Sequence, residues 1–479
     1  MENVMFNAKD SLIKGVNLIS DAVSSTFGPQ GLNVLIKSPS GLHITKDGAT
    51  VAKFVSSDDS YEQMGMDVIR EIAMKTAKDI GDGTTSATIL AQAIVNILGK
   101  EEVHPIILNR ALKLDVEKVL SFLNEYKKEI TTEEDLIKVA TMSVNGDTLL
   151  GELIGKTYYK VGKFGVVLVE ESSDTQTSVK VSDGIKLESG YHSPYFINTI
   201  KNECVLENVN IVYFEKKIST MREITQACTE AINQNRSLLI IAPSVDSSVT
   251  MALLKNRDAG KLNSCCITTP GHGVFRTTLL EDLKINTNLY ASKVVVSKDS
   301  TIVVGKVEST QKEQKIQEIK TILENKELSE FEVNFHKKRL ANYIGGIATI
   351  YIGGYSSIEI KEKKDRIDDA IAAVKAGYEG GVLPGGGIGL YKAANQLQLN
   401  YLNKVLLVPI QVLSKNAGSD LEGIDLNNFW TGKDFRKGVT GDMYELGIID
   451  PYLVTKIALE NAVNAASLIL TSKCSIISM

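Results

Sequence analysis

Three glycine-rich segments of the chain could bring backbone N–H groups close to a phosphate. They are residues 28–31 (GPQG), 81–85 (GDGTT) and 385–387 (GGG). None has the GxxxxGK[ST] pattern of a P-loop, and none is a GxGxxG placed after a strand, so neither nucleotide motif applies. Each segment taken alone is more often an ordinary turn than a phosphate site.

The GDGTT segment is the strongest of the three candidates. Its glycines carry no Cβ that would obstruct a ligand, and the helix expected after it presents free N–H groups and a positive dipole to an anion. The residues after the second glycine, Thr84, Thr85 and Ser86, add hydroxyl donors. Asp82 supplies the carboxylate oxygen that Mg²⁺ prefers when it is shared with phosphate oxygens.

Two further carboxylates lie where they could take part in the same chemistry. Asp47 stands in a turn, TKDG, and Asp369 lies within a helical pattern over residues 358–378. Asp369 is expected to project beside the buried stripe of that helix. The alternative, a surface acid paired with Lys363 or Arg366, stays open on these residues alone.

Length and composition limit the classes of protein to consider. The chain has 479 residues, enough for two or three domains, and its 43% hydrophobic and 23% charged content is that of a globular protein. The net charge of −5 argues against a broad nucleic-acid surface. The five cysteines form no CxxC pair and the five histidines are scattered, so a zinc site has little support and reduced thiols are expected. With no signal-like N-terminus and no long apolar run recognised, we expect a soluble, cytoplasmic protein without membrane contact.

The hydrophobic pattern predicts the elements that hold these residues. Helices are expected over 60–78, 84–98 and 105–126, so that GDGTTS joins two helices. Strands are expected at 164–170, 179–187, 209–214 and 238–242, with helices at 220–235 and 247–258 between them. A helical pair over 309–342, a strand at 347–352 and the helix over 358–378 follow. This order predicts a multidomain α+β protein, in which a strand-rich domain is inserted into a helical one built from both chain ends.

Seven segments, taken together, resemble the signature segments of group I chaperonins, the GroEL family. In chain order they are FGPQGLNV (27–34), TKDGATVA (45–52), GDGTTSAT (81–88), GYHSPYFIN (190–198), KEKKDRIDDA (361–370), EGGVLPGGG (379–387) and LGIIDP (446–451). They occur in the family's order at nearly its spacing, from about residue 7 to residue 474. Seven collinear segments are far more specific than one glycine loop.

The resemblance implies three domains and a ring. An all-helical equatorial ATP-binding domain would comprise residues 1–127 and 380–479, and a small α/β intermediate domain residues 128–183 and 354–379. An inserted α/β apical domain, residues 184–353, would bind client proteins. The family assembles as homo-oligomeric rings, typically sevenfold, around a cavity in which unfolded or partly folded clients are enclosed.

The resemblance also implies a nucleotide site, position by position. Asp82 would hold the Mg²⁺ that bridges the ATP phosphates, with Thr84, Thr85 and Ser86 on phosphate oxygens. The other ATP-binding positions are Thr26, Gly28, Pro29, Lys46, Gly83, Gly386, Ile448 and Asp450. Gly28 would face the phosphates and Pro29 the base, while Gly386 and Asp450 would address the ribose. Thr26 and Lys46 match positions near the family's potassium site, so K⁺ is a candidate second ion.

Catalysis and movement are implied by five further positions. Asp369 would orient the attacking water, assisted by Asp47, in an in-line phosphoryl transfer. Asp369 would reach the site when a hinge closes, which would couple hydrolysis to domain movement. The hinge glycines would be Gly184 and Gly353 above, and Gly381 below.

The client-binding groove departs from the family. Its matching positions are Tyr191, Phe196, Thr225, Cys228, Thr250 and Leu254, a more polar set than the family's apolar helices. A polar groove weakens the hydrophobic drive for capturing unfolded chains and for docking a co-chaperonin. We therefore expect an ATP-dependent chaperonin that folds a restricted set of clients with little need of a separate lid.

Two other classes of protein are considered. A ring-forming, nucleotide-binding scaffold that has lost client folding is favoured by the polar groove, but the complete set of phosphate and carboxylate residues counts against it. A soluble kinase or phosphotransferase has little support, because no motif for an acceptor substrate is recognised.

Overall fold

The computed structural model describes residues 4–6, 9–38, 41–144, 146–163, 165–172, 174–182, 184–270, 274–287, 289–305, 309–323, 329–472 and 474–476. The chain divides into two units. Unit 1 comprises Met1–Tyr159, Ser173–Thr175 and Ile352–Met479, and unit 2 comprises Lys160–Ser172 and Gln176–Tyr351. Both ends of the chain therefore belong to unit 1, as the nested order of the sequence predicts. The finer division into three domains stays a prediction.

Unit 1 is built mainly from helices. Its helices are α1 (Lys9–Ser24), α2 (Gly48–Phe54), α3 (Ser60–Ile80), α4 (Thr84–Leu98), α5 (Pro105–Tyr126), α6 (Glu133–Ser143), α7 (Thr148–Val161, which runs into unit 2), α13 (Ser357–Gly380), α14 (Ile388–Gln396), α15 (Asn403–Leu406), α16 (Val408–Ala417) and α17 (Tyr452–Thr471). The helices predicted on either side of the GDGTTS loop are thus present as α3 and α4, and α5 and α13 also agree with their predicted ranges.

The sequence explains where these helices begin. Asp59 caps α3 by accepting hydrogen bonds from the N–H groups of Tyr61 and Glu62, at 2.8 and 3.0 Å. Thr132 forms a capping box with Asp135 at the start of α6, and Pro105 occupies the first turn of α5. These local signals are strong, which is why the predicted boundaries of the long helices are accurate.

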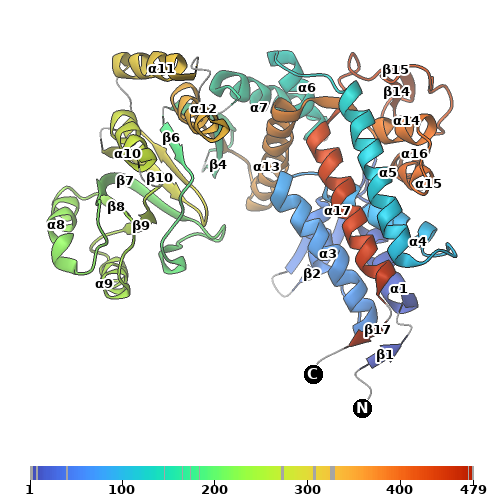
Figure 1. Ribbon diagram of the computed structural model, residues 1–479, viewed down its shortest axis with the longest axis horizontal. Helices are drawn as coiled ribbons and strands as arrows, with labels where there is room; N and C mark the ends of the chain where they lie inside the picture. Colours follow the sequence, from blue (N-terminus) through green and yellow to red (C-terminus); the bar gives the residue numbers. More distant parts are fainter. Residues whose placement is uncertain are drawn as a thin grey trace. The chain divides into compact units, whose positions relative to one another are not determined.

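Helix α17, near the C-terminal end of the chain, packs against α3, α4 and α5 in the centre of unit 1 (Figure 1). It is long and apolar enough to cross a membrane by length and composition, a run that the sequence reading missed. Of its apolar window, 61% is buried inside the protein. Its apolar residues are therefore those of a core helix surrounded by other helices.

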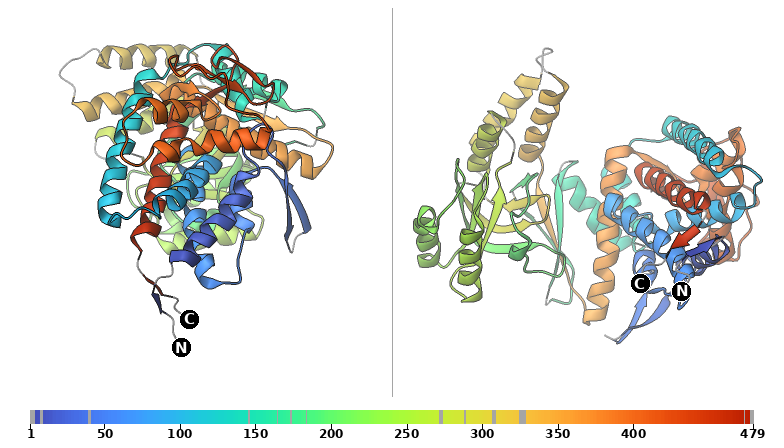
Figure 2. Two further views of the ribbon diagram at one scale, coloured as in Figure 1. Left: turned by 90° about the vertical axis from the view of Figure 1, so that its right-hand side faces the viewer. Right: turned by 60° about the horizontal axis from the view of Figure 1, so that its bottom comes forward.

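Among its described residues, unit 1 also contains four two-stranded sheets, so the prediction of an all-helical domain is wrong. The pairs are β1 (Val4–Phe6) with β17 (Cys474–Ile476), β2 (Val34–Ser38) with β3 (Gly41–Thr45), β13 (Val382–Pro384) with β16 (Ile449–Pro451), and β14 (Thr431–Asp434) with β15 (Val439–Asp442). The first pair joins the two ends of the chain, which lie side by side in both views of Figure 2. Strands of three to five residues give too little periodicity to be recognised in a sequence.

Unit 2 is a mixed α/β structure around a six-stranded sheet. The sheet order is β6 (Gly184–Leu187), β11 (Thr301–Val304), β10 (Tyr290–Val296), β7 (Cys204–Tyr213), β8 (Ser237–Ala242) and β9 (Ser264–Thr268). The pairs β7–β8 and β8–β9 are parallel, and the others are antiparallel. Every residue of β8 is buried, which explains its continuous apolar sequence.

A second, three-stranded sheet has the order β4 (Val166–Glu171), β12 (Ile347–Ile352) and β5 (Ser178–Ser182). The run predicted as one strand over 179–187 is therefore two strands, β5 and β6, in different sheets. Gly184 begins β6, where a Cβ would lie 2.4 Å from the carbonyl oxygen of Val303 and 2.1 Å from Ile347 Cδ1. Only glycine fits this close approach.

The helices of unit 2 are α8 (Thr225–Asn233), α9 (Ser247–Asp258), α10 (Val274–Thr287), α11 (Ser309–Leu323) and α12 (Glu330–Ile344), with short 3₁₀ turns at Pro194–Phe196 and Met221–Glu223. The predicted helical pair over 309–342 is present as α11 and α12.

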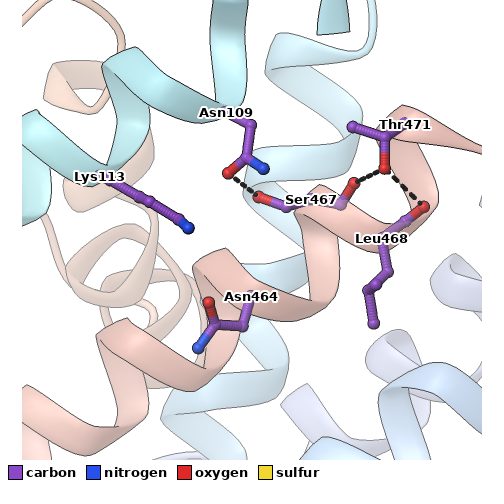
Figure 3. Close-up of a pocket in the computed structure, with 6 residues that line it drawn as sticks. All are labelled: Asn109, Lys113, Asn464, Ser467, Leu468 and Thr471. Atoms are coloured by element: carbon purple, nitrogen blue, oxygen red, sulfur yellow. Dashed lines mark hydrogen bonds between the residues drawn. The ribbon is translucent and has the colours of Figure 1, made fainter. Parts of the chain in front are cut away.

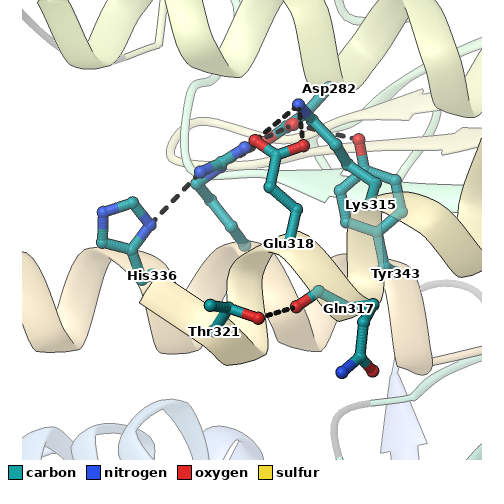
Figure 4. Close-up of polar contacts among 8 residues, drawn as sticks. Asp282, Lys315, Gln317, Glu318, Thr321, His336 and Tyr343 are labelled. Atoms are coloured by element: carbon teal, nitrogen blue, oxygen red, sulfur yellow. Dashed lines mark hydrogen bonds and ion pairs between the residues drawn. The ribbon is translucent and has the colours of Figure 1, made fainter. Parts of the chain in front are cut away.

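A buried ion pair fastens α12 to α10 (Figure 4). The guanidinium of Arg339 donates to both carboxylate oxygens of Asp282, at 2.6 and 2.9 Å, and the Tyr343 hydroxyl donates to the same carboxylate at 2.9 Å. The exposed fractions of the Arg339 and Asp282 side chains are 3% and 2%. Because neither charge can reach water, each depends on the other for its solvation.

Replacing Asp282 by alanine should therefore destabilise the protein strongly. The change leaves the Arg339 guanidinium buried without its counter-ion, at a cost of about 3–5 kcal/mol. Urea unfolding followed by circular dichroism measures this as a lower midpoint. Lys338→Ala is the matched control, because its ion pair with Glu188 is exposed and should contribute less than about 1 kcal/mol. Equal midpoints for the two variants would contradict the assignment.

Candidate functional site

The GDGTTS loop joins α3 to α4 with two glycines in the left-handed backbone region. Gly81 has φ +76° and Gly83 has φ +81°. A Cβ on Gly81 would lie 2.2 Å from the Cβ of Ala372 in α13, and one on Gly83 would lie 2.7 Å from Val454 Cγ1 in α17. The loop is thus held between two helices that come from the second half of the chain.

The start of α4 is open to an anion. Its N-cap is Gly83, which has no side chain to bond the first N–H groups of the helix. Thr84 is buried, and its hydroxyl donates to the carbonyl oxygen of Ala73 at 3.5 Å, toward α3. Thr85 and Ser86 are half-buried at the same end, so the first turn combines N–H groups and hydroxyls at the positive end of the helix dipole.

Asp47 is fixed beside this helix end. As the N-cap of α2 it accepts hydrogen bonds from the N–H groups of Ala49 and Thr50, at 3.0 and 2.8 Å. The next residue, Gly48, is buried against α4, since a Cβ there would lie 2.3 Å from the Oγ1 of Thr85. Backbone packing therefore places the Asp47 turn next to the GDGTT loop.

Asp369 lies on α13, one helical turn before the Ala372 that touches Gly81. Burial raises the pKa of Asp369 well above its ordinary value, and the charges of Asp82 and Asp47 raise it further. Lys363 pairs with Glu359, and Arg366 pairs with Glu362 and Asp147. The two cations considered as surface partners of Asp369 are thus engaged elsewhere, and Asp369 faces the carboxylates of the loop.

Asp450 completes a group of four carboxylates. It lies on β16, where it pairs with Leu383 of β13, and its carboxylate accepts hydrogen bonds from the N–H groups of Gly386 and Gly387. Burial and the charge of Asp82 raise the pKa of Asp450 to about 6, while these two N–H groups oppose the rise. Gly386 has φ +65°, and a Cβ there would meet no atom within 4 Å, so the backbone is bare at this point.

Asp82 lies at the centre of the group. Burial raises its pKa, the Gly83 N–H at 2.5 Å lowers it, and the charge of Asp47 raises it again. Asp82 also contributes to the raised pKa of both Asp369 and Asp450. The four acids are spread over 404 positions of the sequence, from 47 to 450. In unit 1 they nevertheless lie close enough for the charge of one to affect the pKa of another.

These residues fit a hydrated or phosphate-bound Mg²⁺. In the described part of the chain, no three His, Cys, Asp or Glu side chains are close enough to hold a metal ion by themselves. A cation at Asp82 would therefore need most of its ligands from water or phosphate oxygens, as Mg²⁺ does. Such a cation would relieve the mutual repulsion of the four carboxylates.

Two of the predicted ATP-binding residues, Gly28 and Ile448, border one apolar cluster, which we call the base-side wall. Gly28 has φ +85°, and a Cβ there would lie 2.2 Å from Leu413 Cδ2. Leu413 belongs to a cluster with Ile388, Ile410, Phe435 and Met443, against which Phe27 and Ile448 pack. Gly28 and Ile448 are thus brought to the same apolar cluster, and Pro29 follows Gly28 directly. Phe435 and Leu413 were missed by sequence reasoning, since no motif marks them.

The two residues assigned to a potassium site are also in unit 1. Thr26 is buried at the end of α1, and its hydroxyl donates to the carbonyl oxygen of Val23 at 2.8 Å. Lys46 is half-buried and precedes Asp47. Their role toward K⁺ stays a prediction.

The predicted hinge glycines differ in position relative to the two units. Gly353 stands next to the division of the chain between Tyr351 and Ile352, whereas Gly184 lies inside unit 2 and Gly381 inside unit 1. Gly381 has φ +82°, and a Cβ there would lie 2.7 Å from the carbonyl oxygen of Lys128. In this structure Asp369 is already close enough to Asp82 for the charge of Asp82 to raise its pKa.

The predicted client-binding residues are mostly buried in unit 2. Phe196, Cys228, Thr250 and Leu254 each have less than a tenth of their surface exposed, and Tyr191 is half-buried against the same core. Only Thr225 is exposed, and its hydroxyl donates to the carbonyl oxygen of Met221. Large side chains exposed on the same segments are Tyr195, at 73%, and Met251, at 51%. Sequence reasoning missed both, because exposure on a short turn or helix has no sequence signature.

A separate cavity lies between α5 and α17 of unit 1 (Figure 3). Its volume is about 230 Å³, and its lining residues are Asn109, Lys113, Asn464, Ser467, Leu468 and Thr471. The Ser467 hydroxyl donates to the amide oxygen of Asn109 at 3.0 Å across it. None of the sequence-predicted site residues lines this cavity, so it is distinct from the carboxylate group.

The raised pKa of Asp450 predicts an unusual pH dependence of stability. The folded protein binds this proton more tightly than the unfolded chain, whose value is 3.8, so stability falls as pH rises from about 4 to about 6. Asp450→Asn should stabilise the nucleotide-free, Mg²⁺-free protein at pH 7, by on the order of 2 kcal/mol. Thermal unfolding from about pH 4 to about pH 7, which spans the range where Asp450 changes charge, measures the difference.

Asp420 provides a control, because its pKa is shifted in the opposite direction to that of Asp450. Its hydrogen bond with Lys433 lowers its pKa, so the contribution of Asp420 is present at neutral pH and is lost only as pH falls through the lowered value. Asp420→Asn should therefore give no gain at pH 7. Parallel pH profiles for wild type and Asp450→Asn would show that Asp450 does not carry the effect.

Comparison with known proteins shows the family and the fold of the chain. Residues 19–478 match the TCP-1/cpn60 chaperonin family. The chain is 36% identical to the mitochondrial heat shock protein 60 of Candida albicans, over 98% of this chain and 90% of that protein. Its fold is similar to two crystal forms of the chaperonin gp146 from the Pseudomonas aeruginosa bacteriophage EL 2, both in the presence of ATP-BeFx. The TM-scores are 0.76 and 0.71 at 22% and 23% identity, over 99% of each chain. The chain belongs to the TCP-1/cpn60 chaperonin family.

Proposed function

We propose that the protein is an ATP-dependent, Mg²⁺-requiring chaperonin subunit that assembles into rings, sevenfold as is typical of its family, and folds clients in the central cavity. The observation that carries the proposal is the convergence of Asp47, Asp82, Asp369 and Asp450 on the open N-terminus of α4. Four acids beside a helix N-terminus suit a ligand that brings both anionic oxygens and a divalent cation.

Each residue has a role in hydrolysis that follows from its place. The N–H groups and hydroxyls at Thr84, Thr85 and Ser86 bind phosphate oxygens, and Asp82 holds Mg²⁺, which supplies charge neutralisation at the transferred phosphoryl group. Gly386, which has no side chain, leaves room for the nucleotide. The carboxylate of Asp450 is fixed by two N–H groups and has lone pairs left to accept a hydrogen bond from a ribose hydroxyl.

Asp369 accepts a hydrogen bond from the attacking water. Its raised pKa favours the protonated form in the empty site, because burial and neighbouring carboxylates disfavour its charge. With a cation bound at Asp82, the pKa of Asp369 would fall, and its carboxylate would be ionised and able to accept the proton of the water. Asp47, held by Ala49 and Thr50, assists from the opposite side. The ionisation of Asp369 would in this way depend on whether the nucleotide site holds a cation.

Further parts of the proposal rest on the family. Gly184, Gly353 and Gly381 act as hinges between equatorial, intermediate and apical domains, and Thr26 with Lys46 marks a K⁺ site. We place the protein in a cytoplasm-like reducing compartment, since Cys204, Cys228, Cys265 and Cys266 are buried free thiols. The polar residues of the predicted client groove are our reason to propose that client folding needs no separate lid.

Substitution Asp369→Ala tests the catalytic assignment. The turnover of Mg²⁺-ATP should fall by at least about 100-fold, the contribution typical of a positioned base, while ATP binding persists. A phosphate-release assay and equilibrium binding of ATP measure the two quantities. Asp368→Ala, at the neighbouring position, is the control. Turnover that is unaffected by Asp369→Ala would remove Asp369 from the mechanism.

Substitution of exposed apolar side chains of unit 2 tests where clients bind. The double variant Tyr195→Ser, Met251→Ser should capture less of a denatured client, because it removes two large exposed apolar side chains, one on α9 and one on the turn bonded to Arg257 of α9. Suppression of client aggregation by light scattering measures capture. Thr225→Ala is the control, since the hydroxyl of Thr225 is bonded within its own helix turn. Undiminished capture would place client binding elsewhere.

The second candidate function is a nucleotide-binding ring scaffold without folding activity. The exposed threonines of α8, Thr225 and Thr229, favour it, because their hydroxyls are bonded to main-chain carbonyls and offer a client little binding energy. Refolding yield of a denatured client, with and without ATP, separates the two functions. A yield that ATP does not change would favour the scaffold.

A further inference from the structure

One lysine of unit 1 lies at a junction of three segments. Lys128 follows the end of α5, and its backbone N–H and carbonyl both pair with Val382 of β13, at 2.9 and 2.8 Å. The carbonyl oxygen of Lys128 is the atom that leaves room only for glycine at position 381. Since β13 pairs with β16, the backbone of Lys128 borders the small sheet that carries Asp450.

The side chain of Lys128 is held between two aromatic rings. Its Nζ lies 4.1 Å from the ring centroid of Trp430 and 4.4 Å from that of Tyr444. The two rings are 5.8 Å apart and nearly perpendicular, at 88°. A cation over two ring faces is attracted to the quadrupole of each, and the attraction grows when water is excluded. Trp430 is buried, so this contact is sheltered.

The two rings are themselves fixed. The Tyr444 hydroxyl donates to Asp135 in the capping box of α6, and Lys138 Nζ lies 5.0 Å from the same ring. Phe429, the residue before Trp430, stacks on Tyr126 at the end of α5, with centroids 4.6 Å apart. Lys128 therefore enters a preformed aromatic site rather than a surface patch.

The segment that bears these rings leads directly to the nucleotide-site residues. Trp430 precedes β14, and its carbonyl oxygen accepts from the Met443 N–H at 2.9 Å. Met443 packs against Leu413, the residue in contact with Gly28. The Ile448 N–H donates to Met443, and the Ile448 carbonyl accepts from Gly385, so the turn after Tyr444 delivers Ile448 and Asp450 to the site.

We propose that Lys128 is a positioning residue for nucleotide binding, which acts by fixing the 429–450 segment to β13. This rests on the proposed function of the same site. The lysine makes no contact with the four carboxylates themselves. Its loss should allow the base-side wall and Asp450 to shift together, while Asp82 and Asp369, held by Gly81 and α13, stay in place.

The test compares steady-state ATP hydrolysis of wild type, Lys128→Met and Lys128→Arg. Methionine keeps an unbranched apolar stem and removes the charge, whereas arginine retains a cation for both rings. Lys128→Met should raise KM for ATP about five- to tenfold, the range expected for loss of a sheltered cation–π contact, with little change in kcat. Lys128→Arg should restore most of the affinity.

A second readout needs no nucleotide. Trp430 is the single tryptophan of the chain, so acrylamide quenching of its fluorescence reports on this site alone. Quenching should increase in Lys128→Met and not in Lys128→Arg. Tyr444→Leu should raise KM as well, and its combination with Lys128→Met should give less than the product of the two effects, because both remove the same contact.

The outcomes separate this inference from the proposed function. Wild-type protein that neither binds nor hydrolyses ATP would overturn both. Wild-type hydrolysis with the same KM in Lys128→Met would overturn the positioning role and leave the proposed function intact. A fall in kcat without a change in KM would also overturn it, since Lys128 would then act on catalysis rather than on binding.

Discussion

The mutual repulsion of four carboxylates is the constraint on which unit 1 depends. Burial and neighbouring acids disfavour the charged forms of Asp82, Asp369 and Asp450, as their raised pKa values show, and the charge of Asp47 contributes to the rise at Asp82 and Asp369. A chain gains nothing in stability from such a group, so the packing around it must hold the acids together against their repulsion. Sites that keep this kind of electrostatic strain are typically functional, and a cation among the acids relieves it.

The scaffold meets this constraint by close backbone approaches. Gly81 touches α13, Gly83 touches α17, and Gly48 touches the first turn of α4, and in each case a Cβ would collide with its neighbour. The neighbours are the short side chains of Ala372, Val454 and Thr85, which have little freedom to move away from the glycine backbone. The repulsion is therefore opposed by the cores of several helices, and α17 at the C-terminal end is as necessary to the site as the GDGTT loop.

Unit 2 follows a different principle. Its sheet is covered by a core into which Phe196, Cys228 and Leu254 are drawn, so residues that align with a client groove serve instead to stabilise the fold. The surface that remains along α8 is mostly polar, apart from Ile232 at 44% exposure, and further apolar side chains such as Tyr195 and Met251 are exposed. Burial is favoured for apolar groups wherever a core can accept them, and this decides which aligned positions remain exposed.

The sequence by itself determined a good part of this picture. Long helices with local signals, such as α3 with its cap Asp59, were predictable, whereas α6 was not recognised despite the capping box of Thr132. The family was also predictable, because seven segments keep their order. The assignment of the nucleotide-site residues stays a prediction. Short sheets such as β13–β16 were not predictable, since three residues carry no periodicity, and the split of 179–187 into two sheets depends on strands far along the chain.

Only the tertiary structure decided which acids meet. From the sequence, Asp369 could have been either the partner of a surface ion pair or a site residue. In the structure, Ala372 packs on Gly81, so this face of α13 lies toward the GDGTT loop and Asp369 lies near its acids. The tertiary structure likewise decided that Lys128 lies between Trp430 and Tyr444, although about 300 residues separate them in the chain. Helix caps are set by neighbours in sequence, whereas burial, close approach and electrostatic coupling are set by neighbours in space, which a single sequence does not specify.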